Sequence, residues 1–216
     1  NAILIIDISR SMMARDVLVT NIAPAIEGIK AAMMSREIQE FLKEVRPRWK
    51  HYFLFLAFYF AFRPIEISRL RLENVNIDKQ YFVLNEDIQK VRKISYIAIP
   101  DRLVNKIHEL LSWRSLQRSD NDYLLVNTRG NRLNKSNIDH QLVVSCRKID
   151  PDFILYNCRY TAAWRAYEKT RNIYAAQQLL RHESPKQTMI YLNIQHEKIL
   201  EAQRKDMVKI YEDVYF

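Results

Sequence analysis

The stretch YNCRYTAAWRAYEKTRNIYAAQQLLRHESPKQTMIY, from Tyr156 to Tyr191, decides how this chain is interpreted. It contains no glycine, and its small and apolar residues recur every three or four positions. This spacing predicts two helices, a short break and the start of a third, with Ser184 and Pro185 as the N-cap and first helical residue of the last. Such a frame would hold three polar side chains in fixed relation: Arg159, His182 and Tyr191.

The polar residues of this frame fit one kind of chemistry when a second arginine is added. Arg63 lies far upstream, where the apolar run FYFAF ends. Two guanidinium groups can grip the non-bridging oxygens of a phosphate, an imidazole supplies a further donor, and a phenol can attack the phosphorus. The sequence therefore predicts phosphoryl transfer to a tyrosine, with Tyr191 as the nucleophile and His182 nine residues before it.

These residues and their spacing resemble the catalytic domain of the tyrosine recombinases, the phage-integrase family. The family's Arg-x-x-Glu box matches RPIE, which starts at Arg63, and its nucleophile box matches TMIY, which ends at Tyr191. Its His-x-x-Arg box matches YNCR, with Tyr156 in place of histidine, and its Leu-Gly-His box matches LRH, with Arg181 in place of glycine. Four boxes in the right order make the resemblance specific. It covers roughly Ser35 to the C-terminus.

The resemblance implies a mainly α fold with a small antiparallel β-sheet, and a site-specific DNA recombinase or integrase. Tyr191 would attack a DNA phosphodiester, leaving a 3′-phosphotyrosine and a free 5′ hydroxyl. Arg63 and Arg159 would neutralise the charge that builds on the phosphorus. His182 would hydrogen-bond the phosphate or assist proton removal. Strand rejoining would then need neither ATP, nor a metal, nor any other cofactor.

A general acid is expected on a basic turn. The segments VNI, YFVL and ISYIAI, within residues 75–99, predict three strands separated by polar turns. In the family, a lysine on such a hairpin turn protonates the leaving oxygen. Lys90 follows the second strand most naturally and Lys93 is the alternative, while a turn that only touches phosphates is also open. Further DNA contacts are expected from a small set of basic residues: Arg92, Lys93, Arg129 and Arg132. For the last two, a solvated loop is the alternative.

Some expected roles and departures concern individual positions. Glu66 is expected to orient a basic catalytic group rather than to react. Tyr156 can donate a hydrogen bond but is a poor base at neutral pH. Arg181 and Ala61 stand where the family often has glycine, and a left-handed arginine costs about 1 kcal/mol. Two alternative functions therefore stay open, a type IB topoisomerase-like enzyme and a catalytically degenerate DNA-binding protein.

Composition limits the function classes. The 216 residues carry a net charge of +9, which favours an anionic partner, nucleic acid first. Two cysteines are too few for a disulfide framework and favour a reduced compartment. The resemblance implies that this compartment is the cytoplasm and nucleoid of a prokaryotic cell or its virus or mobile element. The apolar run Tyr52–Phe62 is too short to cross a membrane, no histidine has metal-ligand spacing, and two glycines exclude a P-loop.

Helical patterns outside the organising stretch divide the rest of the chain. Ser35 caps a predicted amphipathic helix that Pro47 ends, and a helix buried on all sides is expected from Trp49 to Phe62. Pro64 is expected to begin a helix that includes IEISRLRL, Pro100-Asp101 another, and Ser136 to cap a third.

Three units are expected. Residues 1–34 resemble the end of a core-binding domain and a linker, with the rest of that domain absent, or else an unstructured tail. The catalytic domain would span residues 35–191. Residues 192–216 would form a C-terminal helix or tail that packs on its own core or docks on a neighbouring protomer. The expected partners are a double-stranded DNA recombination site, further copies of the chain (a monomer when free, a homo-tetramer on DNA) and DNA-bending accessory proteins, with no membrane.

Overall fold

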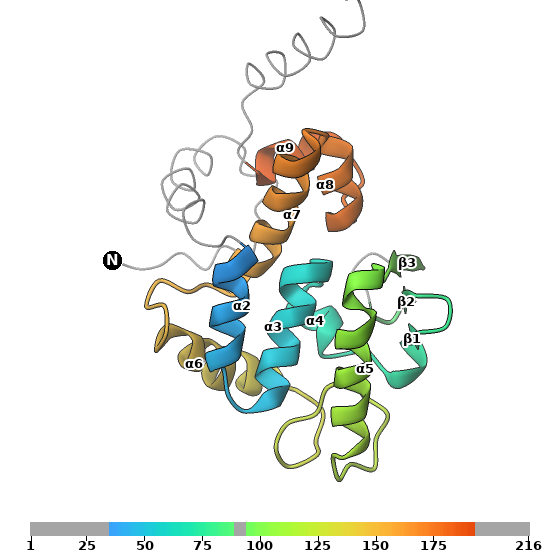
Figure 1. The fold of residues 1–216 in the computed structure, drawn as a ribbon, viewed down its shortest axis with the longest axis vertical. Coiled ribbons are helices and arrows are strands. Elements are labelled where there is room, and N and C mark those ends of the chain that lie inside the picture. The colour runs from blue at the N-terminus through green and yellow to red at the C-terminus, as the bar shows by residue number, and fades with distance from the viewer. Residues whose placement is uncertain (1–34, 89–93, 193–216) are drawn as a thin grey trace, which may run out of the picture.

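The computed structural model describes residues 35–88 and 94–192. Figure 1 shows these residues as a group of helices with a small sheet at one side. The helices are α2 (Ser35–Glu44), α3 (Arg48–Phe60), α4 (Pro64–Ile67), α5 (Asp101–Ser115), α6 (Val143–Arg147), α7 (Tyr156–Thr170), α8 (Ile173–Leu180) and α9 (Pro185–Tyr191). A 3-10 helix, η2 (Leu72–Asn74), and a π-helix, η3 (Asn137–Leu142), complete the helical elements. Among the described helices, none is both long and apolar enough to span a membrane.

The core is built around α3, whose sequence RWKHYFLFLAFYF is apolar on nearly every side. This helix packs against α2, α4 and α7. Its last residue, Phe60, meets Phe62 and Phe82 at ring-centroid distances of 5.8 and 5.0 Å. The predicted buried helix is therefore confirmed, but it ends at Phe60 rather than Phe62. Ala61 adopts a left-handed conformation (φ 50°), which turns the chain toward Arg63.

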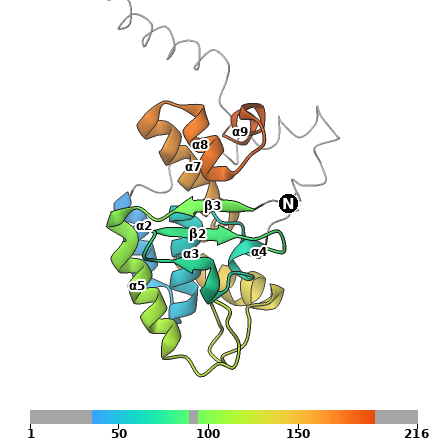
Figure 2. The ribbon, with the colours of Figure 1, turned by 90° about the vertical axis from the view of Figure 1, so that its right-hand side faces the viewer.

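A three-stranded antiparallel sheet lies beside the helical core, as the sequence predicted. Its strands are β1 (Val75–Asn76), β2 (Tyr81–Leu84) and β3 (Ser95–Ala98), in the order β1-β2-β3. Figure 2 shows the sheet in front of α3, with β3 on the side of the α7–α9 group. Phe82 and Leu84 point into the core and anchor the sheet there. The expected class, mainly α with a small antiparallel sheet, is confirmed.

Two local expectations were wrong, one because of tertiary pairing and one because another residue caps the helix. The helix that begins at Pro64 lasts only to Ile67, because Arg71 pairs with Tyr123 in a β-bridge and Leu70 accepts a hydrogen bond from the Leu124 amide. Ser136 does not cap the helix that follows it, since it already has helical dihedral angles and makes no capping hydrogen bond with its side chain.

Two asparagine side chains cap the N-terminus of this helix instead. Asn134 Oδ1 accepts a hydrogen bond from the Asn137 amide at 2.9 Å, and Asn137 Oδ1 accepts one from the Asn134 amide at 3.1 Å. This reciprocal pair satisfies two amides, as a capping box does.

The organising stretch folds into the α7, α8 and α9 group at the top of Figure 1. The predicted cap is present, since Ser184 Oγ accepts a hydrogen bond from the Gln187 amide and Pro185 is the first helical residue. Small residues let these helices approach closely and form a second buried cluster, which includes Ala162, Ala163, Ala176, Leu180 and Leu192. The second cluster includes Ala61 as well, so it meets the chain at the end of α3.

Candidate active site

Arg63 lies in the turn between α3 and α4, where it is the N-cap residue of α4. Its guanidinium Nη1 is 2.7 Å from Glu66 Oε1, and its backbone amide donates to Glu66 Oε2 at 2.7 Å. Glu66 is completely buried. Burial opposes ionisation of this carboxyl, but Arg181, Arg63 and Arg159 outweigh it and lower the pKa of Glu66. The carboxylate therefore stays charged and fixes Arg63 from two directions.

Arg159 lies in the first turn of α7 and is almost fully buried, at 3% exposure. Its guanidinium donates to the carbonyl oxygens of Ala61, after α3, and of Leu180, the last residue of α8. Burial lowers the pKa of Arg159 to about 9, and the nearby Arg63 and Arg181 contribute. Arg159 is still mainly protonated at pH 7, so a second positive charge lies beside the first.

Arg181 adds a third guanidinium that the sequence reasoning considered only for its backbone. The residue is left-handed (φ 55°), as expected for a position where the family has glycine. Its Nη2 lies 2.6 Å from Glu66 Oε2. Spacing gave no signal for this contact, because a long side chain can end far from its own Cα.

His182 follows directly and is held by α9. Its Nδ1 is 3.0 Å from Thr188 Oγ1, a hydroxyl that is fully buried and that the sequence reasoning missed. Burial lowers the pKa of His182 to about 4, with further contributions from Arg159, Arg63 and Arg181. The imidazole is therefore neutral at pH 7. The contact with Thr188 uses Nδ1 and does not involve Nε2.

Tyr191 ends α9 beside this histidine. The two rings meet edge-on, with centroids 5.6 Å apart, and the ring of Tyr160 lies 6.0 Å from that of Tyr191 on another side. Its Oη is buried and has no hydrogen-bond partner among the described residues. Burial raises the pKa of Tyr191, while Arg159 opposes this effect. The phenol is protonated in this state, with a cation close by.

Tyr156 is the first residue of α7, one helical turn before Arg159, and its side chain is 48% exposed. It contributes to the raised pKa of Tyr191, as a nearby ionisable phenol would. The structure thus brings together six of the predicted site residues: Arg63, Glu66, Tyr156, Arg159, His182 and Tyr191.

The other predicted site residues are not part of this cluster. Lys90, Arg92 and Lys93 lie outside the described residues, so their roles stay predictions. Arg132 is exposed, with its Nε donating to the Ser68 carbonyl just after α4 and its guanidinium 4.7 Å from the Tyr123 ring.

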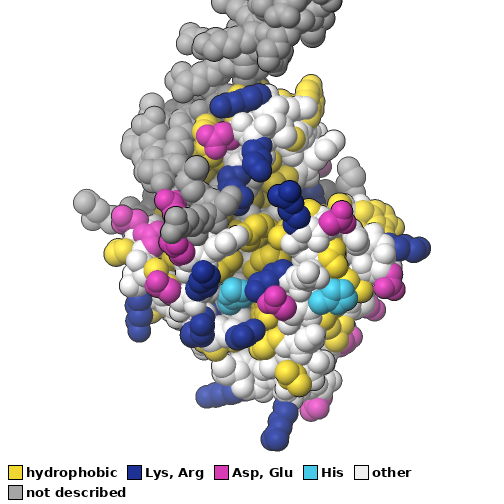
Figure 3. All heavy atoms as spheres, in the orientation of Figure 1, with side chains coloured by type: hydrophobic (Ala, Val, Ile, Leu, Met, Phe, Trp, Pro, Cys, Tyr) yellow, Lys and Arg dark blue, Asp and Glu magenta, His cyan; other side chains and the backbone are white. Residues whose placement is uncertain are grey.

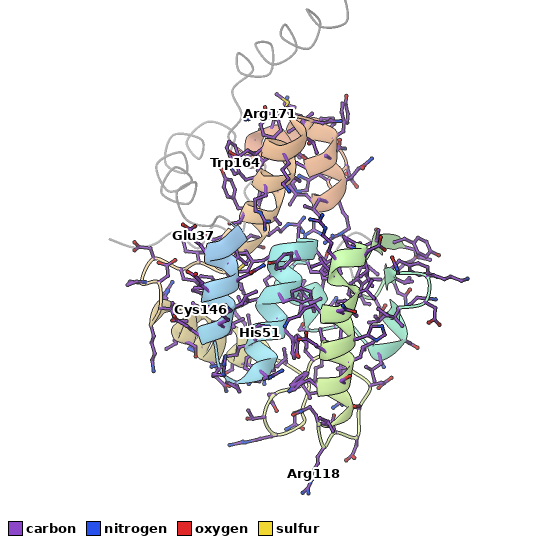
Figure 4. All side chains as sticks on the ribbon, viewed as in Figure 1. Glu37, His51, Arg118, Cys146, Trp164 and Arg171 are labelled. Atoms are coloured by element: carbon purple, nitrogen blue, oxygen red, sulfur yellow. The ribbon has the colours of Figure 1, made fainter. Side chains whose placement is uncertain are left out.

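Arg129 lies elsewhere. It lines a shallow depression with Arg118, a residue that Figure 4 shows at the end of the molecule opposite α7. Lys and Arg side chains are spread over the face shown in Figure 3, with acidic side chains among them, rather than gathered into one patch.

The chain matches a known protein family over most of its length. The sequence profile described as the phage integrase family matches residues 32–198, which is most of the chain. This chain belongs to the phage integrase family. Tyrosine recombinase XerA of Thermococcus kodakarensis is 27% identical over 183 residues, which cover 82% of this chain and 63% of that protein. Tyrosine recombinase XerC of Leptospira interrogans is 26% identical over 145 residues, covering 66% of this chain and 46% of that protein.

Solved structures of the family share the fold. The crystal structure of XerA recombinase superposes with a TM-score of 0.65 at 20% identity, covering 82% of this chain and 65% of that chain. A lambda integrase dimer bound to a COC′ core site gives a TM-score of 0.56 at 16% identity, over 74% of this chain and 47% of that one. The chain thus has a tyrosine recombinase catalytic-domain fold and spans between about half and two thirds of the relatives it matches.

Proposed function

We propose that this chain is a site-specific DNA recombinase that cuts and rejoins strands through a 3′-phosphotyrosine at Tyr191. The observation that carries the proposal is the position of the Tyr191 hydroxyl, buried beside His182 and close enough to Arg159 for its charge to act on the phenol. Family membership supports it, and a similar structure, XerH, was solved as a post-cleavage complex on its difH substrate.

The charge of the site suits a phosphodiester. Three guanidinium groups, those of Arg63, Arg159 and Arg181, face one carboxylate, that of Glu66. The mutual repulsion of the arginines is relieved when an anion enters. Because negative charge grows on the phosphorus during attack, fixed cations at this place would stabilise the transition state more than the ground state.

Strand cleavage would exchange one phosphate ester bond for another. A bond forms between Tyr191 Oη and phosphorus, and the bond between phosphorus and O5′ breaks. The phenolic proton passes to His182, whose neutral imidazole can accept it once the phosphate has offset the surrounding positive charge. Lys90 donates a proton to O5′. A 5′ hydroxyl of the partner strand then reverses the step, and the bond energy kept in the ester makes ATP unnecessary.

The partners are part of the same proposal. We expect a double-stranded recombination site as substrate, a homo-tetramer on DNA and DNA-bending accessory proteins, in the nucleoid of a prokaryotic cell or its mobile element. The relatives reported above are recombinases and integrases, which favours recombination over topoisomerase-like relaxation. The Tn1549 transposon integrase, solved with transposon right end DNA, is a similar structure of this kind.

Replacing the phenol tests the proposal. Tyr191→Phe should bind labelled nicked duplexes as well as the natural chain does but form no covalent adduct. Tyr160→Phe is the matched control, because its hydroxyl is also buried and without a described partner in the same cluster. A covalent adduct that persists in Tyr191→Phe and disappears in Tyr160→Phe would move the nucleophile to Tyr160. Binding without any adduct in all three proteins would favour the degenerate DNA-binding alternative.

A further inference from the structure

Arg181 departs from the family pattern, yet its side chain is more firmly held than that of Arg63. Its exposed fraction is 10%, against 24% for Arg63. The guanidinium Nη1 donates to the carbonyl of Leu179 at 3.2 Å and of Phe60 at 3.4 Å, and Nη2 donates to the carbonyl of Ala61 at 3.3 Å. One side chain thereby joins the C-terminal ends of α3 and α8, where unpaired carbonyls and the negative ends of the helix dipoles attract a cation.

The guanidinium groups of the two arginines contact different oxygens of the Glu66 carboxylate, and Oε2 also accepts from the Arg63 amide. Glu66 Oε1 accepts from Arg63 Nη1 at 2.7 Å, and Oε2 accepts from Arg181 Nη2 at 2.6 Å. Arg181 also lies over the Phe62 ring, with its guanidinium carbon 5.4 Å from the ring centroid. Because Glu66 is fully buried, its carboxylate has a fixed position and directs the Arg63 guanidinium through Oε1. Arg181 holds the same carboxylate through Oε2.

We propose that Arg181 is a positioning residue for strand cleavage, which holds Glu66 and thereby aims Arg63 at the scissile phosphate. This inference rests on the proposed function and deepens it. Glycine, which the family pattern has here, would satisfy the left-handed backbone but leave Glu66 Oε2 without this cation.

A matched pair of variants separates the side chain from the backbone. Arg181→Gly and Arg171→Gly each remove one positive charge and put glycine at a left-handed helix C-cap, since Arg171 has φ 51° at the end of α7. Figure 4 shows Arg171 at the outer tip of α7, away from α3. We expect single-turnover formation of the covalent adduct to fall by about tenfold or more in Arg181→Gly, with DNA binding within about threefold of the natural chain.

The control and the conservative variant complete this comparison. Arg171→Gly should cleave at the natural rate and keep its melting temperature, whereas Arg181→Gly loses the ion pair with the buried Glu66 and should melt at a lower temperature while staying folded at the assay temperature. Arg181→Lys should regain part of the lost rate, because it keeps the charge near Glu66 but cannot fork to two carbonyls. Arg181→Gly at the natural rate would overturn the inference.

Two further readouts distinguish positioning from a general effect on folding. The groups that face Glu66 are Arg63 from the α3–α4 turn, Arg181 from the end of α8 and Arg159 from α7. Without Arg181, Glu66 takes up a proton more readily, so the acid limb of the pH–rate profile should move to higher pH. An unmoved acid limb contradicts the inference.

The second readout is a double-variant cycle with Glu66→Gln. If Arg181 acts through Glu66, the double variant should cleave within about threefold of Glu66→Gln alone. Rate losses that multiply would show independent action and overturn the inference. If the natural chain itself forms no adduct, the proposed function fails and the cleavage role of Arg181 fails with it. An adduct in the natural chain with an unchanged Arg181→Gly rate defeats only the role of Arg181.

Discussion

At the scale of single residues, the site combines three buried or half-buried arginines with a phenol and a neutral imidazole. Arg159 and Arg181 are held mainly by backbone carbonyls at helix ends, so their positions depend on where α3 and α8 end. Glu66 is the carboxylate that pairs with two of the three arginines. The site therefore keeps excess positive charge, and the ionisation of its neighbours responds to it.

The first prediction concerns His182 and acid. The pKa of His182 is about 4 in the folded chain, because of burial and then Arg159, Arg63 and Arg181, against about 6.5 when unfolded. Between these values the unfolded chain binds the proton first, so stability is full above about pH 6.5 and falls toward pH 4. Allowing for solvent screening of this partly exposed ring, its share of the free energy of unfolding is about 1 kcal/mol.

Urea unfolding at pH 7 and pH 4.5 measures this effect. His182→Asn, which can still contact Thr188, should lose less stability on acidification than the natural chain. His140→Asn is the control at an exposed histidine and should leave the pH dependence unchanged. Part of the acid sensitivity will remain, since burial also lowers the pKa of His51. If His182→Asn and the natural chain lose equal stability on acidification, the inference that His182 is buried and neutral in the folded chain is wrong.

Some of these residues could be found from sequence and others could not. The boxes around Arg63, Arg159, His182 and Tyr191 give positions along the chain, and the family resemblance predicted that these residues come together. The contact of Arg181 with Glu66 joins residues 115 positions apart through a flexible side chain, which no local pattern encodes. The same holds for Thr188, whose hydroxyl matters only because α9 turns it toward His182.

At the scale of elements, the end of α3 governs the site. Apolar composition predicted this helix, but its end was predicted two residues too late, since Ala61 takes a left-handed conformation that alanine rarely adopts. The helix after Pro64 was predicted too long because the pairing of Arg71 with Tyr123 overrides local propensity. Sequence patterns predict the end of a helix poorly where a segment distant in the sequence pairs with it.

The second prediction tests the anchor of α3. Phe60 is buried among Phe55, Phe62 and Phe82, and its carbonyl accepts from Arg181. Phe60→Ala should lower the free energy of unfolding by about 3–5 kcal/mol through lost burial and a cavity. Leu116→Ala, at a side chain that is 80% exposed, should change it by less than about 0.5 kcal/mol. Denaturant unfolding gives both values, and similar losses in the two variants would refute the assigned core.

At the scale of the whole molecule, DNA binding depends on the net positive charge and on where the basic residues lie. The net charge of +9 predicts affinity that falls steeply with salt. Arg132 donates to the Ser68 carbonyl at the C-terminal end of α4, the short helix that Arg63 precedes. Arg129 lines a depression with Arg118, at the end of the molecule opposite α7. Arg129 and Arg132 were both predicted to contact DNA from their shared loop, and sequence alone could not separate them.

The third prediction separates these two arginines. Arg132→Gln should weaken DNA binding uniformly across sequences and reduce the slope of log affinity against log salt by about 1, as the loss of one phosphate contact does. Arg129→Gln carries the same change of charge and should leave the slope nearly unchanged. Fluorescence anisotropy over a range of salt concentrations measures both slopes. A larger change for Arg129→Gln would place the DNA on the opposite end of the domain.

The central claim is that Tyr191 becomes bonded to DNA, and covalent trapping tests it most directly. The chain is incubated with labelled nicked duplexes from its host replicon, denatured in detergent and digested, and the DNA-bearing peptide is identified by mass. The account predicts an adduct on the peptide that contains Tyr191, with phosphate attached to its phenolic oxygen. An adduct on any other residue, or bound DNA without an adduct, would contradict it.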